Sequence, residues 1–272
     1  MKKAIIIILL VFIGSADAYD IFGGMQNGMG GTVMFTSPDA SALLNCPAGL
    51  INDRQIVFET GWNRKYELSD LDRVFISAGY RYRYLTAAVG FSQMGKSDYY
   101  TDKILKFNLA YRAKHYAVGL LTSGKIVEIG ADMEKLQAAS IGLCAGVHYK
   151  QYHIGIVVDD INGPKIVENL DGENIKYNVY AEIDGGAIHS ITGRLIFEKY
   201  EKPRVSLGQH IQLTGRNSLF WGLSHNPLTY GGGVKILYSG ASLIYSVSYH
   251  PALGFTHDVS ITYATAGILP GN

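Results

Sequence analysis

The sequence has few charged residues, few cysteines, few prolines and no long apolar run beyond its first residues. Charged residues make up 17% of the 272 positions, against about 25% in average soluble domains. The two cysteines, Cys46 and Cys144, match no metal-ligand spacing and are too few for a disulfide framework, although a single bridge is an open alternative in an exported protein. Because no later stretch reaches 18 consecutive apolar residues, no helical membrane span is predicted.

An excess of charge of either sign is also lacking. The chain has 24 basic and 23 acidic residues, and removing Lys2, Lys3 and Asp17 with the N-terminal segment described next leaves a formal net charge of zero. Nucleic-acid binding needs an excess of basic residues on one face of the molecule. We therefore predict no nucleic-acid partner.

The N-terminus has the pattern of a secretory signal. Two lysines precede an apolar run from Ala4 to Gly14, and Ala16-Asp17-Ala18 supplies small residues for cleavage after Ala18. The run is short for a membrane-spanning helix, which needs about 20 residues. We predict that residues 1–18 are a cleaved signal peptide and that the mature chain is exported; an uncleaved anchor is the alternative.

The sequence is rich in glycine and tyrosine, with 32 Gly and 19 Tyr. It also has many segments in which apolar residues alternate strictly with small or polar ones. Val74, Ile76, Ala78, Tyr80 and Tyr82 alternate with mostly small or charged residues, which is the period-two signature of a β-strand. Residues 124–137 and 159–174 are predicted as irregular insertions. Candidate strands lie near residues 54–62, 72–83, 84–94, 103–113, 115–123, 138–149, 151–159, 174–183, 189–198, 204–213, 218–224, 229–238, 241–249 and 255–264.

The composition of the two strand phases indicates a membrane barrel. The apolar phase often ends in Tyr or Trp, as the aromatic girdles at membrane interfaces do, while the other phase is rich in Gly, Ser, Thr and Ala. Only a closed barrel satisfies every strand N–H and C=O in hydrocarbon. We predict an all-β protein: a transmembrane antiparallel β-barrel of about 14 strands (12–14) over residues 53–264, with a short tail over 265–272, in a Gram-negative-type outer membrane. A secreted soluble β-protein is the alternative.

Residues 19–52 predict a short helix inside this barrel. Pro38 suits the first position of a helix, and Asp39 favours its positive end. Pro47 then ends the helix, because it displaces Cys46 from the helical region. A free helix this short would bury little apolar surface, so we predict that the segment is a plug or hatch in the barrel lumen.

The segment also carries a motif in three stretches, Gly28-Met29-Gly30-Gly31-Thr32, Asp39-Ala40-Ser41-Ala42 and Pro47-Ala48-Gly49-Leu50. This motif resembles the N-terminal signature of FadL-like outer-membrane proteins, and within them the PorV/PorQ group; the C-terminal Tyr249-His250-Pro251 resembles part of that group's last hairpin. The chain departs from the pattern where Cys46 replaces the usual Asn before Pro-Ala-Gly, with Asn45 one residue earlier. The resemblance implies a hatch motif of Gly28, Gly30, Gly31, Asp39, Ala40, Asn45, Cys46, Pro47, Ala48 and Gly49.

The resemblance implies two functions of different classes. The resemblance to FadL-like proteins implies passive uptake of hydrophobic small molecules past the hatch. The PorV/PorQ group implies a non-enzymatic accessory barrel for type IX secretion or surface anchoring, with a secreted protein as partner. Long loops around an apolar groove would favour the first function, whereas short loops and an occluded lumen would favour the second. For both functions we expect a monomer surrounded by outer-membrane lipid.

Residues able to do chemistry are sparse. The eight histidines form no ligand pair with a carboxylate partner, and neither a G-x-S-x-G elbow nor a phosphate loop occurs. Ser206, His210 and Gln212 share one strand phase, which leaves an outer-membrane lipid-modifying enzyme as a distant third function. The run Gly231-Gly232-Gly233 predicts a strand kink or bulge. We predict no catalytic residue, no metal and no cofactor.

Four cations are predicted to face the lumen: Arg81, Arg83, Lys106 and Arg112. They could bind an anionic headgroup, or pair with lumen acids such as Asp39 or Glu182 and hold the plug in place. The second role is favoured, because charges inside a barrel usually pair with one another.

Overall fold

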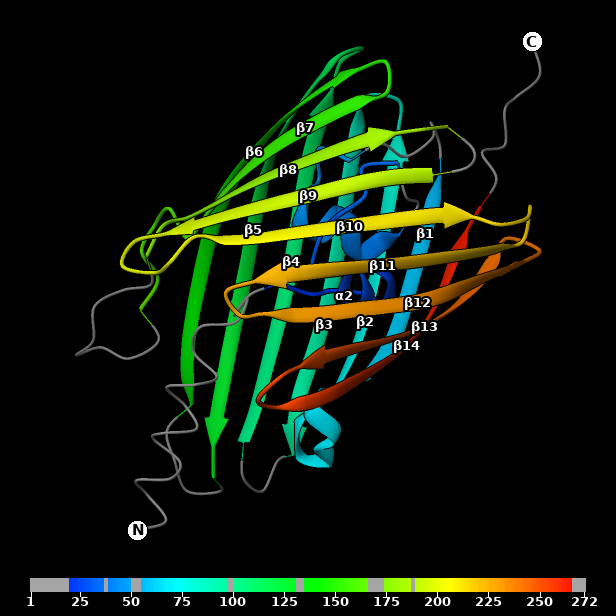
Figure 1. Cartoon of the computed structure of the whole chain (residues 1–272). Helices are drawn as coiled ribbons and strands as arrows, with labels where there is room; N and C mark the ends of the chain where they lie inside the picture. The colour runs from blue at the N-terminus through cyan, green and yellow to red at the C-terminus, as the bar shows by residue number, and fades with distance from the viewer. Residues whose placement is uncertain are drawn as a thin grey trace.

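The computed structural model is a closed barrel of 14 antiparallel strands (Figure 1). It describes residues 20–36, 39–49, 55–96, 100–130, 135–165, 174–186 and 189–265. The predicted signal peptide and nearly all of the predicted tail lie outside these residues. The strands are β1 (Ile56–Arg64), β2 (Asp72–Tyr82), β3 (Leu85–Lys96), β4 (Tyr100–Arg112), β5 (Tyr116–Ile129), β6 (Leu136–Tyr149), β7 (Tyr152–Asp159), β8 (Lys176–Asp184), β9 (His189–Glu198), β10 (Arg204–Gln212), β11 (Asn217–His225), β12 (Thr229–Tyr238), β13 (Ala241–His250) and β14 (Gly254–Ala264).

Every strand pairs with its neighbours in the chain, and a seam between β1 and β14 closes the barrel. The seam runs in continuous register from Val57 opposite Ala264 to Arg64 opposite His257. The predicted all-β, 14-stranded barrel is thus confirmed. The predicted irregular insertion over residues 124–137 is wrong for most of its described residues, because β5 continues to Ile129 and β6 begins at Leu136.

The two ends of the barrel differ in their connections. One end, called here the turn end, carries the short connections β2–β3, β4–β5, β6–β7, β8–β9, β10–β11 and β12–β13, together with the start of β1 and the finish of β14. The opposite loop end carries the other connections, including two 3-10 helices, η1 (Lys65–Glu67) and η2 (Ser69–Leu71), between β1 and β2.

The outer face of the barrel is apolar and the inner face is polar or small. Val89 and Leu105 point outward and are 46% and 55% exposed, whereas the inward-facing Ser77 and Asn108 are buried. Aromatic residues gather near the strand ends, at the turn end (Tyr80, Tyr82, Tyr111, Tyr116, Tyr149, Tyr152, Tyr263) and at the loop end (Trp62, Phe197, Tyr230, Tyr249, Phe255). An apolar band between aromatic girdles on a closed barrel is the surface that hydrocarbon requires.

The lumen holds an N-terminal segment, here called the plug, made of residues 20–36 and 39–49. It contains two short helices, α2 (Gly24–Gly28) and α3 (Ala40–Asn45), drawn in blue inside the barrel (Figure 1). Cys46 follows α3 with an extended φ of −147°, as expected for a residue before Pro47. Plug and wall side chains share three buried apolar clusters, so the core of the molecule is the filled lumen.

Candidate functional site

The two plug helices lie against adjacent parts of the wall. Helix α2 contacts β11 to β14, and α3 contacts β1 to β4. These two sets of strands meet at the seam, so the plug covers the seam from inside. The contacts that hold the plug are the candidate functional site, because they decide whether the lumen is closed.

Wall side chains contact both ends of α3. At its C-terminal end, Asn108 Nδ2 donates to the backbone oxygens of Leu43 (3.0 Å) and Leu44 (2.8 Å), which would otherwise be unpaired helix carbonyls. At its N-terminal end, the Asp39 carboxylate pairs with Lys235 of β12 at 3.2 Å. Asp39 was predicted to take part in such a pair, but Lys235 was not among the four predicted cations.

A second polar connection joins α3 to β1 and to α2. The backbone N–H and the hydroxyl of Ser41 both donate to Glu59, at 3.0 and 2.6 Å. Gln26 Nε2 in turn donates to Ser41 Oγ at 3.0 Å. All three side chains are buried, and a buried polar group left without its partner costs about 1–3 kcal/mol.

Asp20, the first described residue of the plug, collects three wall cations. Its carboxylate lies 2.7 Å from Arg194 of β9, 3.3 Å from Lys106 of β4 and 3.4 Å from Lys176 of β8. The side chains of all four residues are at most 9% exposed. Burial raises the pKa of Asp20, but Lys176, Arg194 and Lys106 outweigh burial and hold that pKa well below its usual range. The carboxylate is therefore charged and ties three strands to one point of the plug.

Arg194 also contacts three other parts of the plug and wall. Its Nη1 donates to the backbone oxygen of Gly31 at 3.1 Å, and its guanidinium lies over the rings of Phe22 (5.3 Å) and Tyr180 (5.2 Å). An arginine suits this position, because its planar group can stack and donate at the same time. Neither Asp20 nor Arg194 was singled out from the sequence.

Two wall carboxylates bind plug donors directly. Glu182 of β8 accepts hydrogen bonds from the backbone N–H groups of Phe35 and Thr36 and from the Thr36 hydroxyl. Asp258 of β14 accepts from Asn27 Nδ2 at 2.8 Å. Glu182 was predicted to pair with a lumen cation, yet its partners in the plug are backbone and hydroxyl donors.

The glycine run of β12 is not a bulge, since β12 pairs in continuous register with both neighbours, and its first residue, Gly231, is part of a glycine seat for the plug. A Cβ added to Gly231 would lie 2.6 Å from the Gly28 oxygen, and one added to Gly222 of β11 would lie 2.4 Å from the Met29 backbone. Conversely, a Cβ on Gly30 would lie 2.7 Å from the Leu223 oxygen. Plug backbone and wall backbone therefore touch, and only glycine permits this approach.

The hatch motif lies along the plug where it meets the wall. Gly30 and Gly31 have φ of +71° and +80°, which explains glycine at both positions. Asn45 donates to the Ile21 oxygen at 2.9 Å, and its Oδ1 is 3.3 Å from Lys106 Nζ. The backbone oxygen of Ala48 lies 2.9 Å from His148 Nε2. Gly28, Asp39, Ala40, Cys46, Pro47, Ala48 and Gly49 are all buried.

The four predicted lumen cations do not form one cluster. Lys106 is buried in mid-barrel against Asp20, whereas Arg81 is buried at the turn end. Arg112, the last residue of β4, is partly buried at the same end. Arg83 does not face the lumen: β2 ends at Tyr82, and Arg83 is an exposed turn residue with φ of +56° whose guanidinium lies over the Tyr82 ring.

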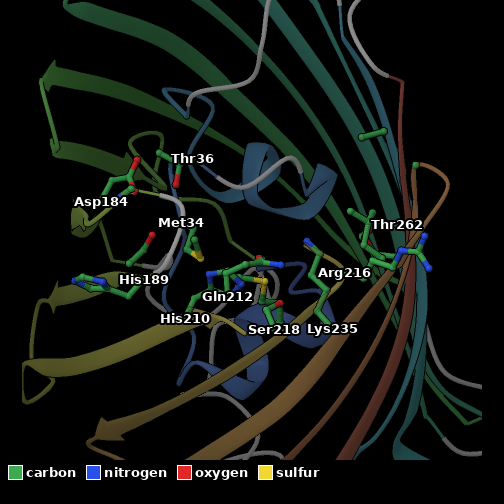
Figure 2. A pocket seen from close by; sticks show the side chains of 17 residues that line it. Met34, Thr36, Asp184, His189, His210, Gln212, Arg216, Ser218, Lys235 and Thr262 are labelled. Carbon is green, nitrogen blue, oxygen red and sulfur yellow. The ribbon is translucent and has the colours of Figure 1, made fainter. Parts of the chain in front are cut away.

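The plug separates two cavities on the β9–β14 side of the lumen. The turn-side cavity, about 370 Å³, is bounded by Met25, Met34 and Thr36 of the plug and opens toward the turn end; Figure 2 shows its lining, with His210, Gln212 and Lys235. The loop-side cavity, about 160 Å³, is lined by Phe22, Asn27, Gly30 and Gly31 of the plug and by Tyr66, Arg194, Ile196, Arg204 and His250.

The three residues considered for a lipid-modifying enzyme lie in different cavities. Ser206 lines the loop-side cavity, whereas His210 and Gln212 line the turn-side cavity. Thr32 of the plug lies between them, since a Cβ on Gly208 would be 2.6 Å from its hydroxyl. The three residues therefore do not converge on one site.

Among the residues that the structure describes, no group of three or more His, Cys, Asp or Glu is placed to hold a metal ion. Within the same residues, no helix has the length and apolarity needed to cross a membrane. His148 and His153 do meet, with Nδ1 atoms 3.2 Å apart.

Fold and site together define a closed β-barrel with an apolar outer face and a plugged lumen. The sequence matches no protein-family model and no curated protein. Among solved structures, the chain is similar to the P. putida toluene transporter TodX, with a TM-score of 0.61 and 8% identity over 90% of this chain and 98% of TodX. A deltaS2 mutant of the TodX monoaromatic hydrocarbon channel gives 0.59 and 8% over 89% and 97%. An Rh. blastica porin mutant gives 0.46 and 10% over 78% and 99%. At 8% identity the likeness to TodX shows a shared fold; the PorV/PorQ group finds no support among these structures.

Proposed function

We propose that the protein is an outer-membrane barrel through which small hydrophobic molecules cross passively. The apolar outer face and the closed strand pairing support the membrane location. Membrane barrels of this class have short turns on the periplasmic side, so the turn end faces the periplasm and the loop end faces outward. The turn-side cavity is then periplasmic and the loop-side cavity is external.

The observation that carries the proposal is the pair of cavities with the plug between them. A solute that enters the loop-side cavity is stopped by Phe22, Asn27 and the Gly30-Gly31 turn, and Met25 and Met34 border the space beyond. The partition on this side is only one layer of plug. A displacement of α2 and the turn that follows it would join the two cavities.

The lining combines apolar side chains with a larger number of polar and charged ones, so it suits a molecule that has both an apolar and a polar part. Phe22, Tyr66 and Ile196 supply apolar surface on the loop side, and Met25, Met34 and Leu237 do so on the turn side. The turn-side volume of about 370 Å³ lies within the range typical of small-molecule sites. TodX, the similar structure, is described as a toluene transporter, and we extend that class of solute to this chain as part of the proposal.

The test is flux through liposomes that contain the purified protein. Liposomes with the full mature chain are expected to take up a labelled monoaromatic hydrocarbon or fatty acid faster than empty ones. Deleting residues 20–50 is expected to leave a folded barrel, seen by circular dichroism, with raised permeability to polar solutes as well. Uptake equal to that of empty liposomes would overturn transport, and unchanged permeability after the deletion would overturn the plug.

A second candidate is an accessory barrel for secretion or surface anchoring, with a secreted protein as partner. Two observations favour it: most connections at both barrel ends are short, and the plug occludes the lumen. Purification from native membranes distinguishes the candidates, because a transporter is expected to carry bound lipid or hydrophobic solute. An accessory barrel is expected to carry a bound protein.

A further inference from the structure

The thiols of Cys46 and Cys144 lie together at the boundary between plug and wall. Cys46 follows α3 in the plug, and Cys144 points into the lumen from β6. Both are free thiols and both are buried. They belong to one apolar cluster that also contains Phe35, Ala48 and Val157.

The strand register places the two sulfur atoms on the same patch of wall. Cys144 pairs with Val157 of β7, and Gly155 lies two residues from Val157 on the same face of that strand. The sulfur of Cys46 fills the space above Gly155, 3.2 Å from where a Cβ on that glycine would be. The sulfur of Cys144 lies on the β5 side, 2.9 Å from where a Cβ on Gly119 would be, so a bridge requires the Cys144 side chain to turn toward β7 and the sulfur of Cys46.

We propose that Cys46 and Cys144 form a disulfide that ties the plug to the barrel wall. The export that the sequence predicts would bring the chain to an oxidising compartment, where such bridges form and persist. The oxidant is a disulfide compound: one cysteine thiolate attacks it and releases a thiol, and the second cysteine displaces the remaining half. The net change joins the two sulfurs, and the oxidant is reduced to two thiols that carry both protons and both electrons.

The bridge forms most readily before the plug is fully docked. Burial raises the pKa of the Cys46 thiol well above its usual value, and a protonated thiol is a poor nucleophile. Oxidation is therefore a step of assembly, completed while the plug still moves. Once formed, the bridge would prevent the whole plug from leaving the lumen. Helix α2 ends at Gly28, about 18 residues before Cys46, so α2 would still be able to shift.

The test is the thiol state of the full mature chain, isolated from native membranes or refolded with oxidised glutathione. After denaturation without reductant, neither thiol is expected to react with a maleimide, and a protease digest is expected to contain one linked pair of peptides that carries Cys46 and Cys144. Adding reductant is expected to free both thiols. Cys144→Ser is the matched control, in which no linked pair of peptides forms and Cys46 is recovered as a free thiol or as its adduct with glutathione.

Two results would overturn the proposal. One is full maleimide labelling of both cysteines in the denatured, unreduced protein after refolding with oxidised glutathione. The other is a separate glutathione adduct on each cysteine, which would show that the two sulfurs do not reach each other. Neither measurement depends on solute flux, so failure of the bridge is distinguishable from failure of the proposed transport.

Discussion

Arg194 Nη2 donates a 2.7 Å charge-assisted hydrogen bond to the Asp20 carboxylate across 174 positions of sequence. Replacing Asp20 by Asn removes the carboxylate charge that lies within 3.4 Å of Arg194, Lys106 and Lys176. Breaking a buried pair in this way costs about 3–5 kcal/mol. We expect the plug of Asp20→Asn to be cleaved by chymotrypsin at Phe22 and Phe35 at much lower urea concentrations than the unmodified protein.

The control for that variant is Asp70→Asn. Asp70 pairs with Lys96 at 2.6 Å, but both side chains are more than half exposed, and exposed pairs contribute little. Chymotrypsin cleavage of the plug is expected to stay unchanged in this variant. Equal cleavage of the Asp20 and Asp70 variants would contradict the structural role assigned to Asp20.

The same carboxylate predicts a pH dependence. Its pKa is lowered in the docked plug, so its contribution to docking is fully present above the pKa of the released plug and is lost as the pH falls through the lowered value. The advantage of the unmodified protein over Asp20→Asn is expected to be constant between about pH 7 and pH 5 and to shrink progressively below about pH 4, the ordinary pKa range of a free Asp. Urea-dependent cleavage by a protease active in each range measures it; an advantage lost already near pH 5 would show that the cations do not control Asp20.

The glycine seat predicts a difference between adjacent residues of β12. A Cβ at Gly231 would lie 2.6 Å from the Gly28 oxygen, whereas one at Gly232, on the outer face, has its nearest neighbour at 3.4 Å. Overpacking of this kind costs about 1–3 kcal/mol. We expect Gly231→Ala to raise solute flux in liposomes and Gly232→Ala to leave it unchanged. Both variants lose the same backbone freedom, so equal fluxes would show that the seat does not hold the plug.

The outer face predicts a dependence on depth in the membrane. Val89 lies near the middle of β3 and pairs with Ala78 and Phe107, while Val74 lies near the loop end beside Trp62. A lysine at the bilayer midplane costs about 2–4 kcal/mol, and this falls to about 0–1 kcal/mol near the interface. Urea unfolding in lipid vesicles is expected to show the larger loss for Val89→Lys. Similar small losses for Val89→Lys and Val74→Lys would argue against a membrane at this face.

The barrel was predictable because strand alternation is a local signal. Period two was visible in β2, β3, β4 and β13, and it placed their apolar phases outward correctly. The signal fails where the residues of both phases are small or polar. This is the case from Thr122 to Lys125, so the predicted strand ended at residue 123 and missed the second half of β5. It also fails where a strand stops, so Arg83 was assigned to the lumen when the chain had already turned.

The plug contacts were only partly predictable, because they depend on how the barrel closes. The helix over Ala40–Asn45 and its end before Pro47 follow from local rules, and Asp39 and Glu182 were recognised as lumen acids. Their partners follow from register across the lumen, which no short-range pattern encodes. Asp20 follows directly on the predicted signal peptide and has no motif, so nothing in the sequence points to the three strands that meet it.

The position of the plug at the seam has a consequence for assembly of the barrel. Hairpins form locally, but β1 and β14 are separated by nearly the whole chain, and the entropy of closing so large a loop makes their pairing late. Asp258 of β14 accepts hydrogen bonds from both Asn27 of α2 and Asn63 of β1, so the plug contacts the two edges that must find each other. We therefore expect the plug to assist ring closure, and a chain without it to reach the same barrel more slowly.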